Sequence, residues 1–355
     1  MRAGSNHPRS VRAQRFSVGL ACHPAFMNSM IWGHPARHQH RNWAVVDVET
    51  SGFQPGQARV ISVAVLGLDA SGAVQESVVS LLNPGVDPGP THVHGLTSAM
   101  LEGQPQFADI VWDVCEVLRG RTLVAHNVGF DYSFLAAEAE LAGAELPIDS
   151  AMCTVELTRR LRLDIDNLRL GTLAAYWGVS QTRPHDAYDD AMVLTGVLEM
   201  ALKLADERDV WLPIRPVTRR RWPNGRVTHE ELQPLKTLAA RIPCEYRNPG
   251  RYVPGQPLIQ GMRIALAAEL ERTPDELIER ILHAGLAYAD AVDGDTSLLL
   301  CRQGQPEQSK VYLAEQLGVP VLSDEQFLDH LGAVVEGEGV QDFPPAVTDD
   351  QLALF

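Results

Sequence analysis

Apolar and polar residues alternate clearly after residue 42, and the pattern predicts three β-strands between residues 43 and 83. The last two of these strands are joined by a turn at Asp69–Gly72. The following segments have helical or strand periodicity: helix 107–120, strand 121–127, helix 132–146, and helices near 167–179 and 189–205. Three strands, then helix and strand in alternation, then helices predict a mixed sheet covered by helices.

The rest of the chain divides at its prolines. Prolines recur through residues 206–257, which predicts a Pro-rich basic linker around the sequence RPVTRRRWPNGR. Residues 258–335 alternate strand and helix patterns and predict a small α/β unit with a parallel sheet. Residues 1–42 lack periodicity and are interpreted as a disordered leader or an over-extended start, and 336–355 as an acidic flexible tail. We therefore expect two folded domains, at 43–205 and 258–335.

Length and composition agree with this division. A chain of 355 residues that is 45% hydrophobic suits two domains with sizeable cores, and no apolar stretch is long enough to cross a bilayer. The five cysteines are scattered and never form a CxxC pair, which favours a reducing, cytoplasmic location. The net charge is −15, yet residues 1–42 hold six arginines and no acid. An acidic total with basic islands is compatible with an enzyme that gathers carboxylates around metal ions.

Two carboxylates interrupt the first apolar strand, WAVVDVET. Side chains alternate faces along a strand, so Asp47 and Glu49 point the same way and repel each other unless a cation lies between them. Carboxylate oxygens select Mg²⁺ or Mn²⁺. An isolated pair of this kind is also explained by a strand end exposed to solvent, so further acids are needed to decide between the two interpretations.

Further acids occur where the pattern changes from strand or loop to helix. Asp131 follows a strand at the start of a helix, where it can be a metal ligand or a helix N-cap. The sequence HDAYDD places His185 and Asp190 before the last long helix. Asp186 and Asp189 are explained by the preference for acids in a first helical turn. On a continuous helix His185 and Asp190 would lie about 140° apart, so we expect His185 in the loop that precedes the helix.

These motifs together resemble a known family. DxE on the first strand, HNVGFDYSFL at a strand-to-helix junction, and a histidine five residues before the last aspartate are similar to the three motifs of the DEDDh 3′→5′ exonucleases. The resemblance covers about residues 43–205 and is nearest to the proofreading epsilon subunit of bacterial DNA polymerase III. It implies a ribonuclease H-like mixed α/β sheet with flanking helices.

The resemblance also implies roles for individual residues. His185 would be the general base, and two divalent ions, Mg²⁺ or Mn²⁺, would be bound by four carboxylates: Asp47, Glu49, Asp131 and Asp190. Two ions activate the attacking water and stabilise the leaving oxygen in phosphodiester hydrolysis. A histidine with a pKa near neutrality can take the proton of that water. The terminal nucleotide would be contacted by Thr50, His94, Gly95, Asn127 and Phe130.

The second compact segment resembles a BRCT domain. A small residue at Gly285, the strand DTSLLL and the closing GVPVLSDEQFLDHL carry this resemblance. Such domains often bind DNA ends, phosphopeptides or protein partners. Lys310 matches a phosphate-binding lysine of the family, but Ala267 and Ala268 stand where the partner hydroxyl would be, which argues against phosphopeptide binding. A purely structural role for this segment remains an alternative.

The last five residues, QLALF, resemble the peptide with which bacterial proteins bind the sliding clamp. The resemblance implies docking of four side chains: Gln351, Leu352, Leu354 and Phe355. A few anchors of this kind can supply most of a peptide's affinity. A tail of amphiphilic residues that folds back on the surface is the alternative interpretation.

The expected function is metal-dependent 3′→5′ exonuclease activity on DNA, releasing 5′-mononucleotides in replication proofreading or repair. The expected partners are DNA with a free 3′ end, the bacterial sliding clamp and a replicative polymerase, with no membrane, in the cytoplasm near the nucleoid. One alternative is an RNA 3′ exonuclease similar to ribonuclease T or oligoribonuclease. Another is a non-catalytic scaffold that docks on the clamp. The basic cluster of residues 219–222 could bind a single strand by charge and stacking or be a solvated linker.

Overall fold

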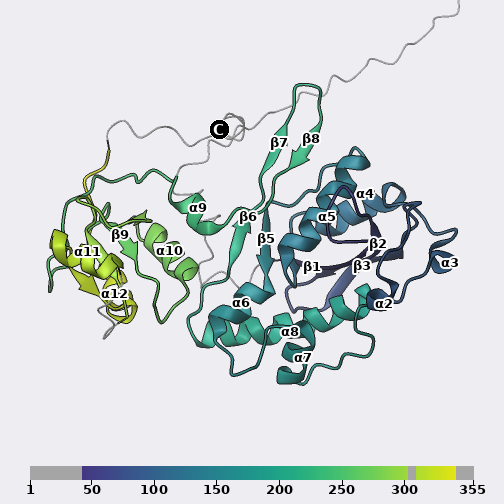
Figure 1. The fold of residues 1–355 in the computed structure, drawn as a ribbon, viewed down its shortest axis with the longest axis horizontal. Helices are drawn as coiled ribbons and strands as arrows, with labels where there is room; N and C mark the ends of the chain where they lie inside the picture. Colours follow the sequence, from purple (N-terminus) through teal and green to yellow (C-terminus); the bar gives the residue numbers. More distant parts are fainter. Residues whose placement is uncertain (1–41, 303–308, 341–355) are drawn as a thin grey trace, which may run out of the picture.

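The computed structural model describes residues 42–302 and 309–340, which form two units, each built around its own sheet (Figure 1). The predicted leader and the clamp-binding peptide lie outside the described residues. No helix among the described residues is long and apolar enough to cross a membrane.

The first unit contains a six-stranded sheet. Its strands are β1 (Trp43–Thr50), β2 (Val60–Leu68), β3 (Val74–Leu81), β4 (Thr122–Ala125), β5 (Ser150–Cys153) and β6 (Ile214–Pro216). They lie in the order β3-β2-β1-β4-β5-β6. β1 pairs antiparallel with β2 and parallel with β4, so β1 is central and the sheet is mixed, as the sequence predicts.

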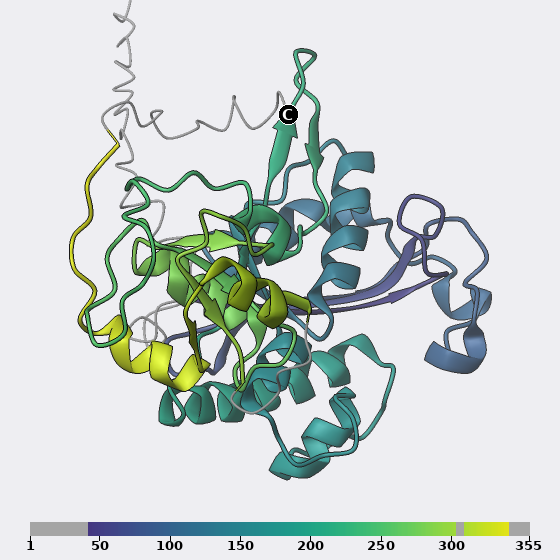
Figure 2. The same cartoon turned by 60° about the vertical axis from the view of Figure 1, so that its left-hand side comes forward.

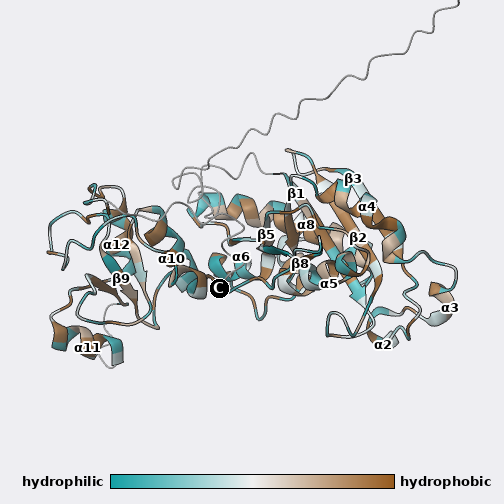
Figure 3. Ribbon diagram, turned by 90° about the horizontal axis from the view of Figure 1, so that it is seen from above, coloured by the Kyte–Doolittle hydropathy of each residue, from teal (hydrophilic) through white to brown (hydrophobic). Residues whose placement is uncertain are grey.

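Helices cover both faces of this sheet. α4 (Phe107–Leu118) and α5 (Val128–Leu141) share a core with Ala44, Val46 and Val48 of β1. α6 (Thr154–Leu161) and α8 (Ala187–Glu207) share a second core with Trp43 and Val45, and α7 (Leu170–Trp177) packs on α8. The apolar central strands β1 and β2 appear brown in Figure 3. Two short helices, α2 (Thr91–His94) and α3 (Ser98–Leu101), lie beyond β3.

The alternation along β1 determines where its acids point. Odd-numbered residues of the strand face α8, and even-numbered residues face α4 and α5. Asp47 and Glu49 therefore leave the strand on the α8 side, near its carboxyl end. The two acids are half-buried, whereas Val48 between them is buried.

Residues 206–257 are more than the linker that the prolines predict. Their first part supplies β6 to the large sheet, and β7 (Arg219–Arg221) and β8 (Val227–His229) form a hairpin that projects from the body of the molecule (Figure 2). The short helix α9 (Leu235–Ala239) packs on the second unit. Prolines break helices but are tolerated at edge strands and turns, so the proline count did not reveal this structure.

The second unit is a small parallel α/β structure. Its elements are β9 (Arg263–Leu266), α10 (Pro274–His283), β10 (Ala287–Ala289), β11 (Leu298–Leu300), α11 (Ser309–Leu317), β12 (Val321–Leu322) and α12 (Asp324–Leu331). All pairings are parallel, in the order β10-β9-β11-β12. The element order and the parallel sheet agree with the sequence prediction, while the BRCT-like assignment stays a prediction.

Charged side chains join the two units. Arg160 of α6 donates two hydrogen bonds to Glu279 of α10, at 2.7 and 3.0 Å, and both side chains are fully buried. Arg215 of β6 donates to Glu279 at 2.8 Å and to Asp275 at 2.6 Å. Arg280 of α10 donates to the backbone and carboxylate of Asp209. Bidentate pairs with defined geometry hold α10 against α6 and β6.

Candidate active site

The amino end of α8 brings together three groups that can hold a metal ion. One ligand atom each of Glu49, His185 and Asp190 lies within 4.8 Å of the others. Asp190 occupies the first turn of α8, which is capped by Asp186 through a 3.0 Å hydrogen bond from Asp189 N–H. The interpretation of Asp186 and Asp189 as helix-start residues is confirmed. Asp190 is therefore the acid of this segment that turns toward β1.

His185 lies in the loop before α8, as expected. Its backbone has a φ of 65°, in the left-handed region that few residues other than glycine adopt, and its side chain is exposed. Its N–H donates to one oxygen of Asp190 at 2.9 Å, and the Gln181 amide donates to the other at 2.7 Å. The loop conformation and the orientation of Asp190 are thus fixed together.

Asp131 reaches the same region from the opposite face of the sheet. α5 begins at Val128, so Asp131 lies inside the first turn, while Asn127 with a φ of 73° takes the N-cap position. The N-cap interpretation of Asp131 is therefore wrong. Its carboxylate is 5% exposed and accepts the N–H of Val48 at 3.2 Å. Asp131 thus contacts β1 between the two acids of the DxE motif.

The four carboxylates share an unfavourable electrostatic environment. Burial, followed by the charges of Asp131, Asp190 and Glu49, raises the pKa of Asp47 well above its usual value. Burial and the neighbouring acids Asp190 and Asp186 raise the pKa of Glu49 to about 8. Burial raises the pKa of Asp131 to about 8 and also raises that of Asp190. Among the described residues, none of the four forms an ion pair with a lysine or arginine.

This arrangement fits hard divalent cations. Converging carboxylates repel one another at neutral pH unless a positive charge is placed between them. Oxygen ligands with one imidazole nearby are the donor set that suits Mg²⁺ or Mn²⁺. The geometry brings Glu49, His185 and Asp190 together, and the charges of Asp47 on β1 and Asp131 on α5 act within the same group of acids.

Comparison with known proteins decides the class of this site. Residues 44–198 match the family model described as "Exonuclease", RNase_T. These residues are similar to an exonuclease domain and are called the exonuclease domain below. The matched segment contains every residue of the acidic site, and it resembles the DEDDh-type exonucleases, a family that uses divalent metals.

Two curated proteins are similar in sequence to this segment, and one solved structure aligns with it. The exonuclease domain is 29% identical over 161 residues to DNA polymerase III subunit epsilon of Treponema pallidum, covering 44% of this chain and 75% of that protein. It is also 29% identical over 161 residues to the 3′-5′ exonuclease DinG of Bacillus subtilis, covering 44% of this chain and 17% of DinG. A solved structure of E. coli exonuclease I with a dT13 oligonucleotide aligns with a TM-score of 0.41 and 17% identity, over 48% of this chain and 42% of that one.

Two of the residues predicted to contact the nucleotide, Thr50 and His94, are buried in the structure. Thr50 is buried, and its hydroxyl donates to Gly52 O at 2.7 Å. His94 is 8% exposed, accepts the N–H of Leu96 at 3.0 Å, and lies 3.2 Å from Pro88 O through its other ring nitrogen. Both ring nitrogens are therefore engaged with the backbone. The His94 side chain shapes this turn, and its contact with the terminal nucleotide stays a prediction.

The other three predicted contacts lie close to the acids in sequence. Gly95 ends α2 with a φ of 74°. Asn127 is exposed at the start of α5, and Phe130 is half-buried with its ring 4.9 Å from that of Phe134. Their roles in binding a nucleotide stay predictions.

The sequence pattern did not single out Phe53. This ring lies four residues after Glu49, in the loop that leads from β1 to β2, and is 81% exposed. Its position just beyond the acids makes it a candidate for contact with a substrate. The signal in the sequence was an aromatic residue directly after the strand that carries the DxE motif.

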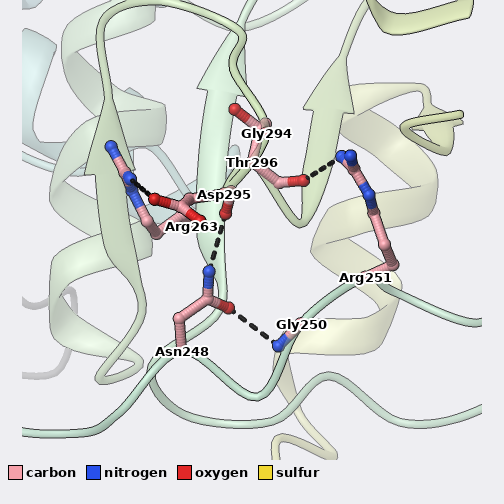
Figure 4. A pocket seen from close by; sticks show the side chains of 7 residues that line it. All are labelled: Asn248, Gly250, Arg251, Arg263, Gly294, Asp295 and Thr296. Carbon is pink, nitrogen blue, oxygen red and sulfur yellow. Dashed lines mark hydrogen bonds and ion pairs between the residues drawn. The ribbon is translucent and has the colours of Figure 1, made fainter. Parts of the chain in front are cut away.

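A polar hollow elsewhere does not compete with this site. It lies on the second unit and is lined by Asn248, Gly250, Arg251, Arg263, Gly294, Asp295 and Thr296 (Figure 4). Asn248 donates to Asp295 O at 2.6 Å, and Arg251 donates to Thr296 O at 2.5 Å. Arg263 lies 3.5 Å from Asp295. The polar side chains that line the hollow are therefore engaged with one another and with the backbone of the second unit.

Proposed function

We propose that the protein is a 3′→5′ exonuclease that hydrolyses DNA and releases 5′-mononucleotides. The observation that carries this proposal is that Glu49, His185 and Asp190 lie together, with Asp47 and Asp131 close enough for the acids to raise one another's pKa values. None of these acids pairs with a lysine or arginine among the described residues. The relatives add support, because one is named as a DNA polymerase III subunit and another as a 3′-5′ exonuclease.

The chain's own residues explain how such a site can act. Asp47, Glu49, Asp131 and Asp190 would hold the divalent ions, which when bound lower the pKa of water and offset charge on the phosphate. His185 is exposed beside Glu49 and Asp190, where its ring can accept the proton of the attacking water. The bond from its own N–H to Asp190 keeps that ring at the metal site.

Phe53 is proposed to contact the bases of the substrate. Aromatic side chains stack on bases without regard to sequence, and each stacked base contributes about 1–3 kcal/mol. The exposed ring stands on the loop that follows Glu49, so a strand whose 3′ end enters the acidic site would pass it. Phe53→Ala is expected to raise the KM for single-stranded DNA by about tenfold.

The remaining parts give the enzyme its partners in this proposal. The C-terminal QLALF would tether the enzyme to the bacterial sliding clamp, in the cytoplasm near the nucleoid, and a tether raises the effective concentration at DNA to the order of mM. Lys310 donates to the backbone oxygens of Leu266 and Asp290, at 2.8 and 2.6 Å. That amine is occupied inside the second unit, so the BRCT-like unit is proposed to bind DNA or protein rather than a phosphopeptide.

The decisive experiment measures degradation of 5′-labelled single-stranded DNA, mispaired duplex DNA and RNA with Mg²⁺ or Mn²⁺. We expect the DNA substrates to shorten from the 3′ end, with loss of activity in Asp47→Ala and a fall of about 10²-fold or more in His185→Ala. Asp113→Asn, an exposed acid of α4, is the matched control. Faster degradation of RNA would show that RNA, and not DNA, is the substrate. A folded, metal-loaded protein that cleaves neither DNA nor RNA would overturn the proposal.

The clamp proposal has its own test. Deleting residues 351–355 should remove binding to purified sliding clamp and leave turnover on short oligonucleotides unchanged. Substituting Leu354 and Phe355 by alanine should have the same effect, because apolar anchors supply the affinity of such peptides. Unchanged clamp affinity in both variants would contradict the role of the tail.

A further inference from the structure

The loop between β1 and β2 carries Phe53 and is closed at its neck by two hydrogen bonds. Ser51 N–H donates to Arg59 O at 2.9 Å, and Arg59 N–H donates to the Ser51 hydroxyl, also at 2.9 Å. Residues 53–57 beyond this neck are exposed. The position of Phe53 relative to the acids therefore depends on what holds Arg59.

Glu138 of α5 holds Arg59. Its carboxylate accepts hydrogen bonds from Nε of Arg59 at 2.7 Å and from Nη2 of Arg59 at 2.8 Å, in a bidentate pair. The same carboxylate accepts the N–H of Val60 at 3.1 Å, and its side chain is 3% exposed. One acid thus binds both the side chain at the loop neck and the first residue of β2.

Glu138 and Asp131 act as a pair along α5. They are seven residues apart, which is nearly two helical turns, so they lie on the same face. Asp131 accepts the N–H of Val48 in β1, and Glu138 accepts the N–H of Val60 in β2. α5 therefore fixes the strand that carries the acids and the strand that begins after the loop, one carboxylate for each.

The start of the loop also contacts the segment before α2. A Cβ placed on Gly89 would lie 2.2 Å from Ser51 O, so only glycine permits this approach. That contact constrains Ser51 from one side, and the hydrogen bonds to Arg59 constrain it from the other. The pair between Arg59 and Glu138 is the charged connection from this loop to the helix that carries Asp131.

We propose that Arg59 and Glu138 are positioning residues that hold Phe53, and with it the incoming strand, in register with the metal site. This inference rests on the proposed exonuclease function. Neither residue touches the substrate in it; both act through the loop. Loss of the pair should therefore weaken binding of a nucleic-acid strand far more than it slows hydrolysis of a bound one.

The variants separate charge from geometry. Glu138→Gln keeps one oxygen for Val60 N–H but removes the charge and the bidentate fit. Arg59→Gln removes the positive charge of the ion pair. Arg59→Lys keeps the positive charge but lacks the planar guanidinium that makes two parallel hydrogen bonds. We expect Glu138→Gln and Arg59→Gln to raise the KM for single-stranded DNA about 5- to 10-fold with kcat within about twofold, and Arg59→Lys to recover part of the loss.

A double-mutant cycle with Phe53→Ala decides whether the pair acts through that ring. If it does, Glu138→Gln should add less than about twofold to the KM of a Phe53→Ala enzyme. Mn²⁺ affinity measured by calorimetry should stay unchanged, because neither Arg59 nor Glu138 is one of the acids that would hold the ion. Glu116→Gln, which breaks the exposed pair with Arg119 on α4, is the control and should change nothing.

Hydrogen exchange of the amides of residues 51–58 gives a readout that needs no activity. Faster exchange in Glu138→Gln and Arg59→Gln, with the α8 amides unchanged, is expected. A fall in kcat at constant KM, full additivity with Phe53→Ala, or unchanged exchange would each overturn the inference. An inactive wild-type protein would overturn the proposed function alone, and the exchange rates would still decide whether Glu138 holds the loop.

Discussion

Two groups of buried carboxylates in this chain meet opposite electrostatic conditions. At the interface of the units, Glu276 and Glu279 are completely buried. Glu279 accepts hydrogen bonds from Arg160 and Arg215, and Glu276 accepts from Arg272 and Arg280, at distances between 2.7 and 3.2 Å. In the exonuclease domain, the four site acids have no such guanidinium among the described residues.

The contrast separates structure from chemistry. A buried carboxylate is tolerated when a permanent cation in the same chain neutralises it, and the result is a fixed contact. The acids of β1, α5 and α8 are left unneutralised instead, which raises their pKa values and makes the site take up protons or divalent ions. Within the part of the chain that the structure describes, the lack of arginine partners, more than the presence of acids, distinguishes the candidate active site.

The largest expected effect is at the interface. Glu279→Ala leaves Arg160 buried without its partner, and removal of one member of a buried pair costs about 3–5 kcal/mol of unfolding free energy. Urea denaturation should show this loss, while Glu271→Ala, which removes the exposed partner of Arg162, should change stability by less than about 1 kcal/mol. Equal effects of the two variants would contradict the contrast.

A smaller effect follows from the pH dependence of the metal-free protein. Glu49 and Asp131 have pKa values of about 8 in the folded protein, against ordinary values of 4.5 and 3.8. The folded state therefore binds more protons than the unfolded chain between about pH 4 and pH 8, so stability should fall as pH rises through that window. With solvent screening we expect a loss of about 1–2 kcal/mol, seen as a lower Tm in EDTA and reversed by Mn²⁺.

The smallest effect is the most specific to the site. Asp47→Asn removes a charge that its neighbours repel, so the metal-free variant should be more stable than the wild type at pH 8, by about 1 kcal/mol. Thermal unfolding in EDTA measures this gain. The same variant should lose the stabilisation by Mn²⁺. A destabilised Asp47→Asn protein in EDTA would show that Asp47 is neutralised by the chain itself.

Local patterns in the sequence predicted the positions of several site residues. Period-two alternation located β1 and showed that Asp47 and Glu49 share a face, and the turn-to-helix pattern placed His185 before α8. These features depend on neighbours in sequence, so a single chain reveals them. The parallel order of the second unit was also predictable from its alternating segments.

Contacts between residues far apart in the chain could not be predicted from the sequence. Arg160 and Glu279 are 119 residues apart, and nothing in either segment indicates that they meet. The engagement of both His94 ring nitrogens depends on the turn from Pro88 to Leu96, which motif matching does not see. The β7–β8 hairpin was missed because prolines and arginines suit a solvated connection as well as an exposed strand pair.

Helix α8 has a consequence for how long a substrate must be to reach both units. Its first turn holds Asp190, and just past its last turn Arg208 O accepts a hydrogen bond from Arg272 of the second unit. A helix of 21 residues is about 30 Å long. Because a DNA strand rises about 3.4 Å per nucleotide, roughly nine nucleotides span that length. If the proposed DNA substrate runs along α8, oligonucleotides shorter than this engage the hydrolytic end alone, and turnover plotted against length should change slope near that size.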